Sequence, residues 1–338
     1  MEWSAEPLPE VRVAYETWGE LSPARDNAVL ILHALTGDSH VVGEIGPGHP
    51  SPGWWGTLVG PDGWIDTDRW YVVAPNILGG CQGTTGPGSA APDGQPWGAR
   101  FPRLTTRDQV AAEIALADAL GIERWALIVG GSAGGMRAVE WAVTVPDRVS
   151  RLMLLATTAA ASADQIAWCH AQIRAIMCDP VGGLEVARQI AHITYRSADE
   201  LAARFGREDQ TGESVAEGGR FAVQSYLDHH GSKLARRFDP GSYVTLTQAM
   251  NSHDVGRDRG GVEAALRRVT ARTIVAGIDS DRLYPLEQSS QLAAGIPTAG
   301  PLRVIPSAHG HDGFLIEVDA VGKIVTELLG DRPAAGDG

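Results

Sequence analysis

The 338-residue sequence predicts an α/β fold with a mostly parallel central sheet and an inserted helical cap, and three observations support it. Short apolar runs alternate with helical patterns near both ends of the chain. Runs such as ALIV and RLMLL are apolar at every position, as in parallel strands covered by helices on both faces. The strand signal disappears over residues 158–272, where only helical patterns remain. We therefore expect a core of residues 1–157 and 273–330 with a cap, or lid, of residues 158–272.

The expected elements follow from periodicity and from the turn residues that bound them. Strands are expected at residues 11–15, 28–32, 70–74, 125–129, 151–156, 273–276 and 302–305. Core helices are expected at residues 105–120, 136–145 and 318–329, and cap helices at residues 164–177, 182–195 and 220–236. Residues 331–338 are mostly Pro, Ala, Gly and Asp, a composition that predicts a flexible tail.

Composition and charge narrow the classes of partner. An apolar content of 43% with 20% charged residues is ordinary for a globular protein, so the chain can bury a core. The net charge of −13 and the lack of a Lys/Arg cluster argue against a nucleic-acid partner. Three scattered cysteines form no disulfide framework, and no histidine pair has a zinc-like spacing with an acid. We therefore expect no metal site and no tightly bound cofactor.

The N-terminal sequence indicates where in the cell the protein is expected. MEWSAEPLPEVRV has acidic residues and prolines where a signal peptide would have a basic start and an apolar stretch. No apolar run approaches the length of a membrane span. These features predict a cytoplasmic protein with no membrane partner.

A nucleophile motif stands between an expected strand and an expected helix. Residues 130–134, GGSAG, fit the G-x-S-x-G pattern once in the chain, after WALIV and before MRAVEWAV. The glycines of this pattern permit a tight strand-to-helix turn that exposes the serine hydroxyl. A mere Gly-rich turn is the alternative, but the flanking strand and helix favour Ser132 as a nucleophile.

A serine nucleophile needs a histidine base and a carboxylate that orients the histidine. With this motif the order along the chain is Ser, Asp or Glu, then His. Asp279 or Asp281 follows the strand TIVAG, and His309 or His311 follows the strand LRVI. Both pairs lie at carboxyl ends of strands, where open α/β sheets bind their ligands. Spacing alone does not choose within either pair.

The tetrahedral intermediate of acyl transfer also needs backbone N–H donors that form an oxyanion hole. One donor is expected from Ala133, the residue after the nucleophile. The other is expected from the HALTGD turn at residues 33–38, with Leu35 as the candidate. This turn could also be a simple connection.

The sequence resembles the homoserine O-acetyltransferases of methionine biosynthesis, which have the α/β-hydrolase fold. The stretches that carry the resemblance are NAVLILHALTGD, PGWW, NILGGCQGTTGP, GGSAGGMRAVEW, RFAVQSYLDHHGSKLARRFDPGSY, SDRLYP and GHDGF. They run in family order over residues 27–315, nearly the whole chain. NSHDVGRDRGG and PGHPSPGWW are similar to actinobacterial members.

The resemblance implies roles for residues that spacing leaves open. It assigns Asp281 and His311 to the catalytic triad. Asp312 resembles the residue that receives the substrate ammonium group, Arg220 the residue that binds the carboxylate, and Tyr226 a neighbouring pocket residue. An Arg and an Asp are suitable partners for the two charges of a free amino acid.

The resemblance further implies a ping-pong transfer of acetyl from acetyl-CoA to L-homoserine through acyl-Ser132, in a homodimer formed through the cap. The chain departs from the family in having Ala133 where Met is usual, which makes the wall beside the acyl group smaller. The alternatives are homoserine or serine O-succinyltransfer, another acyltransfer within the family, an esterase on the same triad, and a non-catalytic binding protein.

Overall fold

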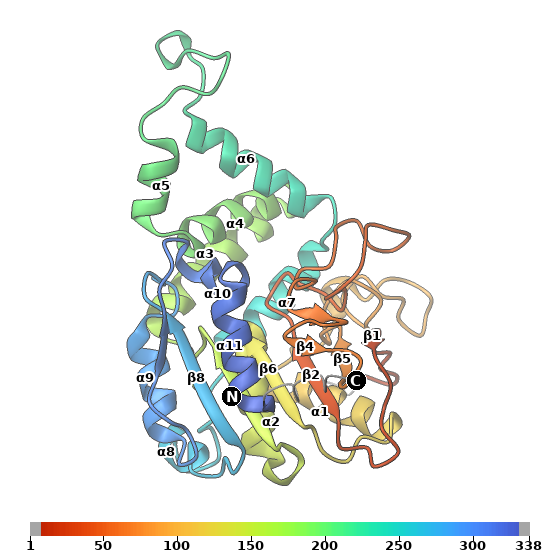
Figure 1. Cartoon of the computed structure of the whole chain (residues 1–338). Helices are drawn as coiled ribbons and strands as arrows, with labels where there is room; N and C mark the ends of the chain where they lie inside the picture. The colour runs from red at the N-terminus through yellow and green to blue at the C-terminus, as the bar shows by residue number, and fades with distance from the viewer. Residues whose placement is uncertain (1–7, 331–338) are drawn as a thin grey trace.

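The computed structural model of the chain describes residues 8–330, and the expected flexible tail lies outside this range. A seven-stranded sheet has the order β1-β5-β2-β6-β7-β8-β9. All neighbours are parallel except β1, which pairs antiparallel with β5 at one edge. A group of helices lies beyond one end of this sheet (Figure 1). The predicted fold class, a mostly parallel sheet with an inserted helical region, is confirmed.

The bounds of the elements place the strands close to their expected positions. The strands are β1 (Tyr15–Trp18), β2 (Ala28–Leu32), β3 (Val59–Gly60), β4 (Ile65–Asp66), β5 (Tyr71–Pro75), β6 (Leu127–Gly131), β7 (Arg151–Leu155), β8 (Arg272–Ile278) and β9 (Arg303–Ile305). The α-helices are α1 (Thr106–Ala119), α2 (Ala133–Thr144), α3 (Ala163–Cys178), α4 (Pro180–Tyr195), α5 (Ala198–Phe205), α6 (Ala222–Ala235), α7 (Pro240–Asn251), α8 (Val262–Leu266), α9 (Leu286–Gly295), α10 (Gly313–Ile316) and α11 (Val318–Leu329). Within the described residues, no helix has both the length and the apolar character needed to cross a bilayer.

The central strands are buried because helices cover both faces of the sheet. Strand β2 is buried at all five positions. Leu30 and Leu32 pack on one face with α1 and α2, whereas Val29 and Ile31 pack on the other face with α11. Trp55, from the long loop after β2, is 1% exposed in this second cluster. The long loop after β2, which is rich in Gly and Trp, therefore contributes to the core.

The first strand begins later than the expected residues 11–15. Strand β1 covers Tyr15–Trp18, and the preceding residues bond to a loop. The backbone N–H groups of Arg12 and Ala14 donate to the hydroxyls of Thr85 and Thr84. Side-chain oxygens thus satisfy these donors, so an apolar run need not pair as a strand.

The helical segment leaves the core after β7 and returns close to its point of departure. Backbone hydrogen bonds run from Ala161 N to His253 O and from Val255 N to Ala159 O. Helices α3–α7 lie between these points, and α8 packs in the core cluster through Leu266. The chain therefore re-enters the core near Val255, before the boundary expected at residue 272. That this segment acts as a lid stays a prediction.

Candidate active site

Ser132 lies at a sharp turn between β6 and α2. Its backbone has φ 56° and ψ −126°, a strained conformation for a residue with a side chain. The turn requires glycine, because a Cβ on Gly134 would lie 1.9 Å from the carbonyl oxygen of Leu32. Two hydrogen bonds hold the strained residue: Ser132 N donates to Leu155 O, and Thr157 Oγ1 donates to Ser132 O. This is the geometry that the G-x-S-x-G motif predicts.

A buried carboxylate–histidine pair follows the last two strands. His311 Nδ1 lies 2.6 Å from Asp281 Oδ2, and the two side chains are 3% and 0% exposed. The second carboxylate oxygen of Asp281 accepts hydrogen bonds from the backbone N–H groups of Leu283 and Tyr284. Asp281 is thus fixed on both sides and fixes the orientation of the imidazole.

The other members of the two candidate pairs have structural contacts. Asp279 Oδ1 accepts a hydrogen bond from the backbone N–H of Ser307. His309 Nδ1 lies 3.2 Å from Glu200, and its side chain is 38% exposed. The structure therefore brings together Asp281 and His311, as the resemblance implies.

The environment of His311 favours a base next to the serine. Burial lowers the pKa of His311, but the Asp281 carboxylate outweighs it and leaves that pKa above the usual value. The Nε2 atom is buried and has no hydrogen-bond partner within residues 8–330. Tyr284 stacks on the imidazole at 5.0 Å between ring centroids. Nε2 is consequently open to accept a proton.

The expected oxyanion donors lie on two elements that the buried side chain of Arg137 connects. Leu35 is in the turn after β2, and Ala133 is the first residue of α2, where the N–H has no intrahelical acceptor. Arg137 of α2 is fully buried and donates to the carbonyl oxygen of His33 in that turn, while it pairs with Glu113 of α1. The hydrogen bond to His33 thus anchors the turn against α2, and the ion pair holds Arg137 in place.

His33 holds the same turn from another direction. Its Nδ1 lies 2.8 Å from Ala34 O, and its Nε2 accepts the backbone N–H of Ile77 at 3.1 Å. Burial and the nearby Arg137 lower the pKa of His33 to about 3. The ring is therefore neutral at physiological pH and connects two loops as a structural residue.

Helix α4 of the cap brings a cation to the site that sequence reasoning missed. Arg188 Nη1 donates to Thr36 Oγ1 at 3.2 Å. Thr36 lies in the HALTGD turn at residues 33–38, which we call the oxyanion turn. The Arg188 guanidinium lies 5.5 Å from the ring centroid of Tyr195, and that ring lies 5.7 Å from His311. Arg188 and Tyr195 are seven residues apart, a spacing that places them on one face of a helix. This spacing is the signal that could have identified them.

Asp312, which follows the histidine, is the anionic group of the site. Its Oδ2 lies 3.1 Å from Arg196 Nη2 at the end of α4. Burial raises the pKa of Asp312, while Arg196, His311 and Arg188 counteract this rise. Cationic Arg188 and anionic Asp312 therefore both lie near the imidazole.

The structure does not bring Arg220 to this group. Its side chain is 47% exposed and pairs with Glu213 and Asp228. Arg220 lies two residues before the start of α6 in the sequence. Tyr226 is buried, and its hydroxyl lies 3.1 Å from His192 Nδ1. The resemblance assigned the carboxylate to Arg220, but the contacts place Arg188 next to the triad instead.

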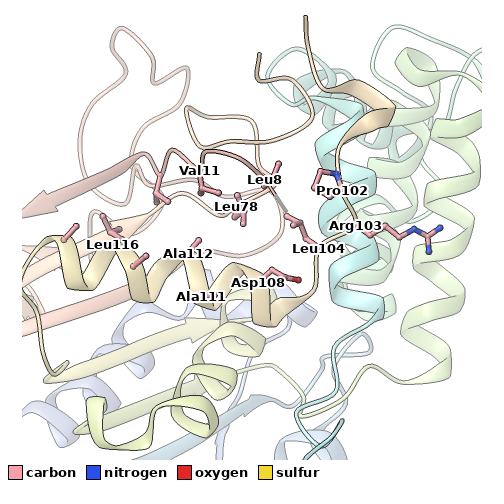
Figure 2. Close-up of a pocket in the computed structure, with 13 residues that line it drawn as sticks. Leu8, Val11, Leu78, Pro102, Arg103, Leu104, Asp108, Ala111, Ala112 and Leu116 are labelled. Atoms are coloured by element: carbon pink, nitrogen blue, oxygen red, sulfur yellow. The ribbon is translucent and has the colours of Figure 1, made fainter. Parts of the chain in front are cut away.

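Two cavities differ in their relation to the triad. A groove of about 680 Å³ lies between residues 8–13 and α1, with an apolar lining that includes Leu8, Val11 and Leu116 (Figure 2). It contains no candidate residue. A cavity of about 30 Å³ is lined by Leu35 and Tyr284, together with cap residues. The small cavity, unlike the groove, is therefore lined by residues of the candidate site: Leu35 of the turn after β2, and Tyr284, which stacks on His311.

Comparison with known proteins agrees with this geometry. Residues 27–317 match the family described as alpha/beta hydrolase fold, so the chain is an α/β hydrolase in class. The homoserine O-acetyltransferase of Thermobifida fusca (strain YX) is 64% identical over 95% of this chain and 89% of its own. The crystal structure of homoserine O-acetyltransferase from Bacillus anthracis has a TM-score of 0.85 at 25% identity, covering 95% and 93% of the two chains. That of esterase E22 has a TM-score of 0.85 at 26% identity, covering 95% and 94%. The chain belongs to the homoserine O-acetyltransferase family.

Proposed function

We propose that the protein transfers the acetyl group of acetyl-CoA to the hydroxyl of L-homoserine, through an acetyl ester on Ser132. The observation that carries this proposal is the pair of opposite charges, Arg188 and Asp312, beside the buried His311–Asp281 pair. An esterase needs only the triad, whereas a free amino acid needs a cation and an anion in addition. Membership of the family supports the same acceptor.

In the first half-reaction His311 Nε2 takes the proton of the Ser132 hydroxyl, and Oγ attacks the thioester carbonyl. The developing oxyanion receives the N–H groups of Leu35 and Ala133. His311 then gives the proton to the departing CoA sulfur, and acetyl-Ser132 remains. Asp281 stabilises the imidazolium that forms between these steps.

In the second half-reaction homoserine takes the place of CoA. His311 removes the proton of the homoserine hydroxyl, whose oxygen attacks the acetyl carbonyl. The same N–H groups receive the oxyanion. Collapse of the intermediate forms O-acetylhomoserine, and the proton returns to Ser132.

The acceptor is held by charge on both ends. Arg188 is placed to receive the carboxylate, since its guanidinium lies beside the oxyanion turn. Asp312 is placed to receive the ammonium group. Tyr226 supports the pocket from behind through His192. Arg220 does not lie beside the triad, so we assign the role of binding the substrate carboxylate to Arg188 instead.

The acetyl donor rests on family membership, because relatives that are 54–64% identical to this chain are homoserine O-acetyltransferases. Ala133 stands where the family usually has Met. It is 4% exposed and packs in one cluster with Leu35.

Acetyl-CoA acts in this scheme as a co-substrate, with no tightly bound cofactor.

We also propose a homodimer formed through the cap, because α3 and α4 expose Ile166, Met177, Val181, Val186 and Ile193. Such an apolar face on a helix pair favours association. Sedimentation equilibrium of wild type and of a Met177→Asp, Val181→Asp variant checks it: the wild type is expected as a dimer and the variant as a monomer. The free cysteines suit the reducing cytoplasm, where we place the protein.

Release of free CoA thiol tests the proposal. Acetyl-CoA and succinyl-CoA are supplied with L-homoserine, L-serine or no acceptor, and Ser132→Ala is the control. Homoserine-dependent release from acetyl-CoA is the expected result. Release independent of acceptor would make the protein a hydrolase, as the likeness to esterase E22 allows, and preference for succinyl-CoA or serine would change donor or acceptor. No turnover with any donor would indicate a binding protein.

A further inference from the structure

A second cluster of chemically reactive side chains lies outside the triad. It joins Glu16 of β1 to His40 and His49 of the loop that follows the oxyanion turn. His40 Nδ1 lies 3.0 Å from Glu16 Oε2, and His49 Nε2 lies 3.9 Å from Glu16 Oε1. One nitrogen or oxygen from each residue lies within 4.8 Å of the others. The proposed acyl transfer uses none of the three.

Both ring nitrogens of His40 face hydrogen-bond acceptors. Nε2 lies 3.2 Å from the carbonyl oxygen of Glu44, and Nδ1 lies 3.0 Å from Glu16 Oε2. A neutral imidazole carries one N–H, so it can donate to only one of these two oxygens. The other contact brings two acceptors together, and they repel each other unless a cation lies between them. A metal ion between Nδ1 and Glu16 would relieve this repulsion.

The surroundings match those of histidine metal ligands. Such ligands usually donate their other ring N–H to a backbone carbonyl or a carboxylate, and His40 Nε2 faces the carbonyl oxygen of Glu44 in this way. The loop is shaped around this ring, since a Cβ on Gly43 would lie 2.5 Å from His40 Cε1. The backbone of His49 exchanges two hydrogen bonds with Gly46, and its ring stacks on that of His40 at 3.8 Å between centroids.

We propose that Glu16, His40 and His49 bind a divalent transition-metal ion of the zinc type. Two imidazoles and one carboxylate are a ligand set that suits zinc and its neighbours, with a fourth position left for water. Donors around tetrahedral zinc lie roughly 3.3 Å apart, and two stacked rings cannot both point a nitrogen lone pair at one ion. The ring of His49 must therefore rotate out of the stack when the ion binds. His49, whose side chain is 35% exposed, can make this movement and gives the ion an entry path.

The site revises the expectation of no metal and suggests a structural purpose. His40 is two residues beyond Asp38, the last residue of the oxyanion turn. The bound ion would tie this loop to edge strand β1. It would not take part in the acyl transfer, which needs no metal.

Cobalt and zinc binding by the untagged full chain test the proposal. After EDTA treatment and its removal, Co²⁺ titration is expected to give one equivalent of a tetrahedral visible spectrum, which Zn²⁺ displaces. Zn²⁺ should also raise the thermal unfolding midpoint of the wild type. His49→Gln is the test variant, because a half-exposed side chain can be replaced without unfolding the chain, and exposed His170→Gln is the matched control.

The expected loss of Co²⁺ affinity in His49→Gln is at least about 100-fold, with no loss in His170→Gln. Glu16→Gln, which keeps the shape of the side chain, should lose affinity as well. Absence of stoichiometric binding by the wild type would overturn the proposal. Equal affinity in His49→Gln and His170→Gln would also overturn it, because the metal would then bind elsewhere.

Discussion

The two sides of the active site differ in how their residues are held. On the core side, Ser132 and Asp281 follow the buried strands β6 and β8, and His311 follows the edge strand β9. Backbone hydrogen bonds fix Ser132 and Asp281. On the cap side, Arg188 and Tyr195 lie on one helix, and Arg188 reaches the core through a single bond to Thr36. The core side suits the chemical steps, which need rigid placement. The cap side suits the choice of acceptor, which needs charges at a distance from the reacting atoms.

The largest effect is expected on the core side. Ser132→Ala removes the nucleophile, so kcat should fall by about 10⁵-fold or more, as for other triad serines. Mass spectrometry should find no acetylated protein after exposure to acetyl-CoA, whereas the wild type without homoserine should carry one acetyl group. Retention of substantial transfer by this variant would mean that the two substrates react directly.

Asp281→Asn should lower kcat by about 10⁴-fold, because His311 loses the partner that sets its tautomer. The variant also removes the charge that raises the pKa of His311. Activity needs neutral His311, so in the wild type it declines as pH falls through this raised pKa. In the variant the acid limb of kcat/KM should therefore move to lower pH. An unmoved acid limb would assign it to another group.

A smaller and more selective effect is expected on the cap side. Arg188→Gln should lower kcat/KM for homoserine by about 10- to 100-fold, since a charge-assisted bond to the carboxylate is lost. Acetylation of Ser132 needs no amino acid, so the rapid release of one equivalent of CoA should stay unchanged. Stopped-flow thiol detection separates the two half-reactions. Equal slowing of both would mean that Arg188 acts on the core and not on the acceptor.

The smallest effect is expected at Arg220, the matched control for Arg188. Its ion pairs with Glu213 and Asp228 are exposed, and such pairs contribute little. Arg220→Gln should change kcat/KM for homoserine by less than about two-fold. A larger loss than in Arg188→Gln would restore the carboxylate role that the family resemblance gave to Arg220.

Sequence patterns predicted the core side better than the cap side, for a physical reason. The elbow at Ser132 is local, because strand, glycine turn and helix follow one another in the chain. The choice of Asp281 over Asp279 depends on which carboxylate meets His311, a contact across 30 residues that spacing cannot give. The resemblance supplied this choice.

Two groups of residues could not be predicted from sequence patterns: the cap residue that faces the triad, and the proposed metal ligands. The role of Arg188 depends on how α4 lies over Thr36, a packing that helical periodicity does not specify. Glu16, His40 and His49 come from a strand and two parts of a loop, so no ligand spacing announces them. Sequence patterns therefore predicted best those features whose reactive residue and backbone turn lie within a few residues of each other.

The way the cap is attached has a consequence for how this fold can be rebuilt. The backbone at Ala159–Ala161 and at His253–Val255 is joined by two hydrogen bonds, so the inserted segment begins and ends at one place. Segments whose ends already meet can be exchanged with little cost in chain entropy to the remainder. A graft of another helical cap between Ala161 and His253 should leave the sheet and its triad in place.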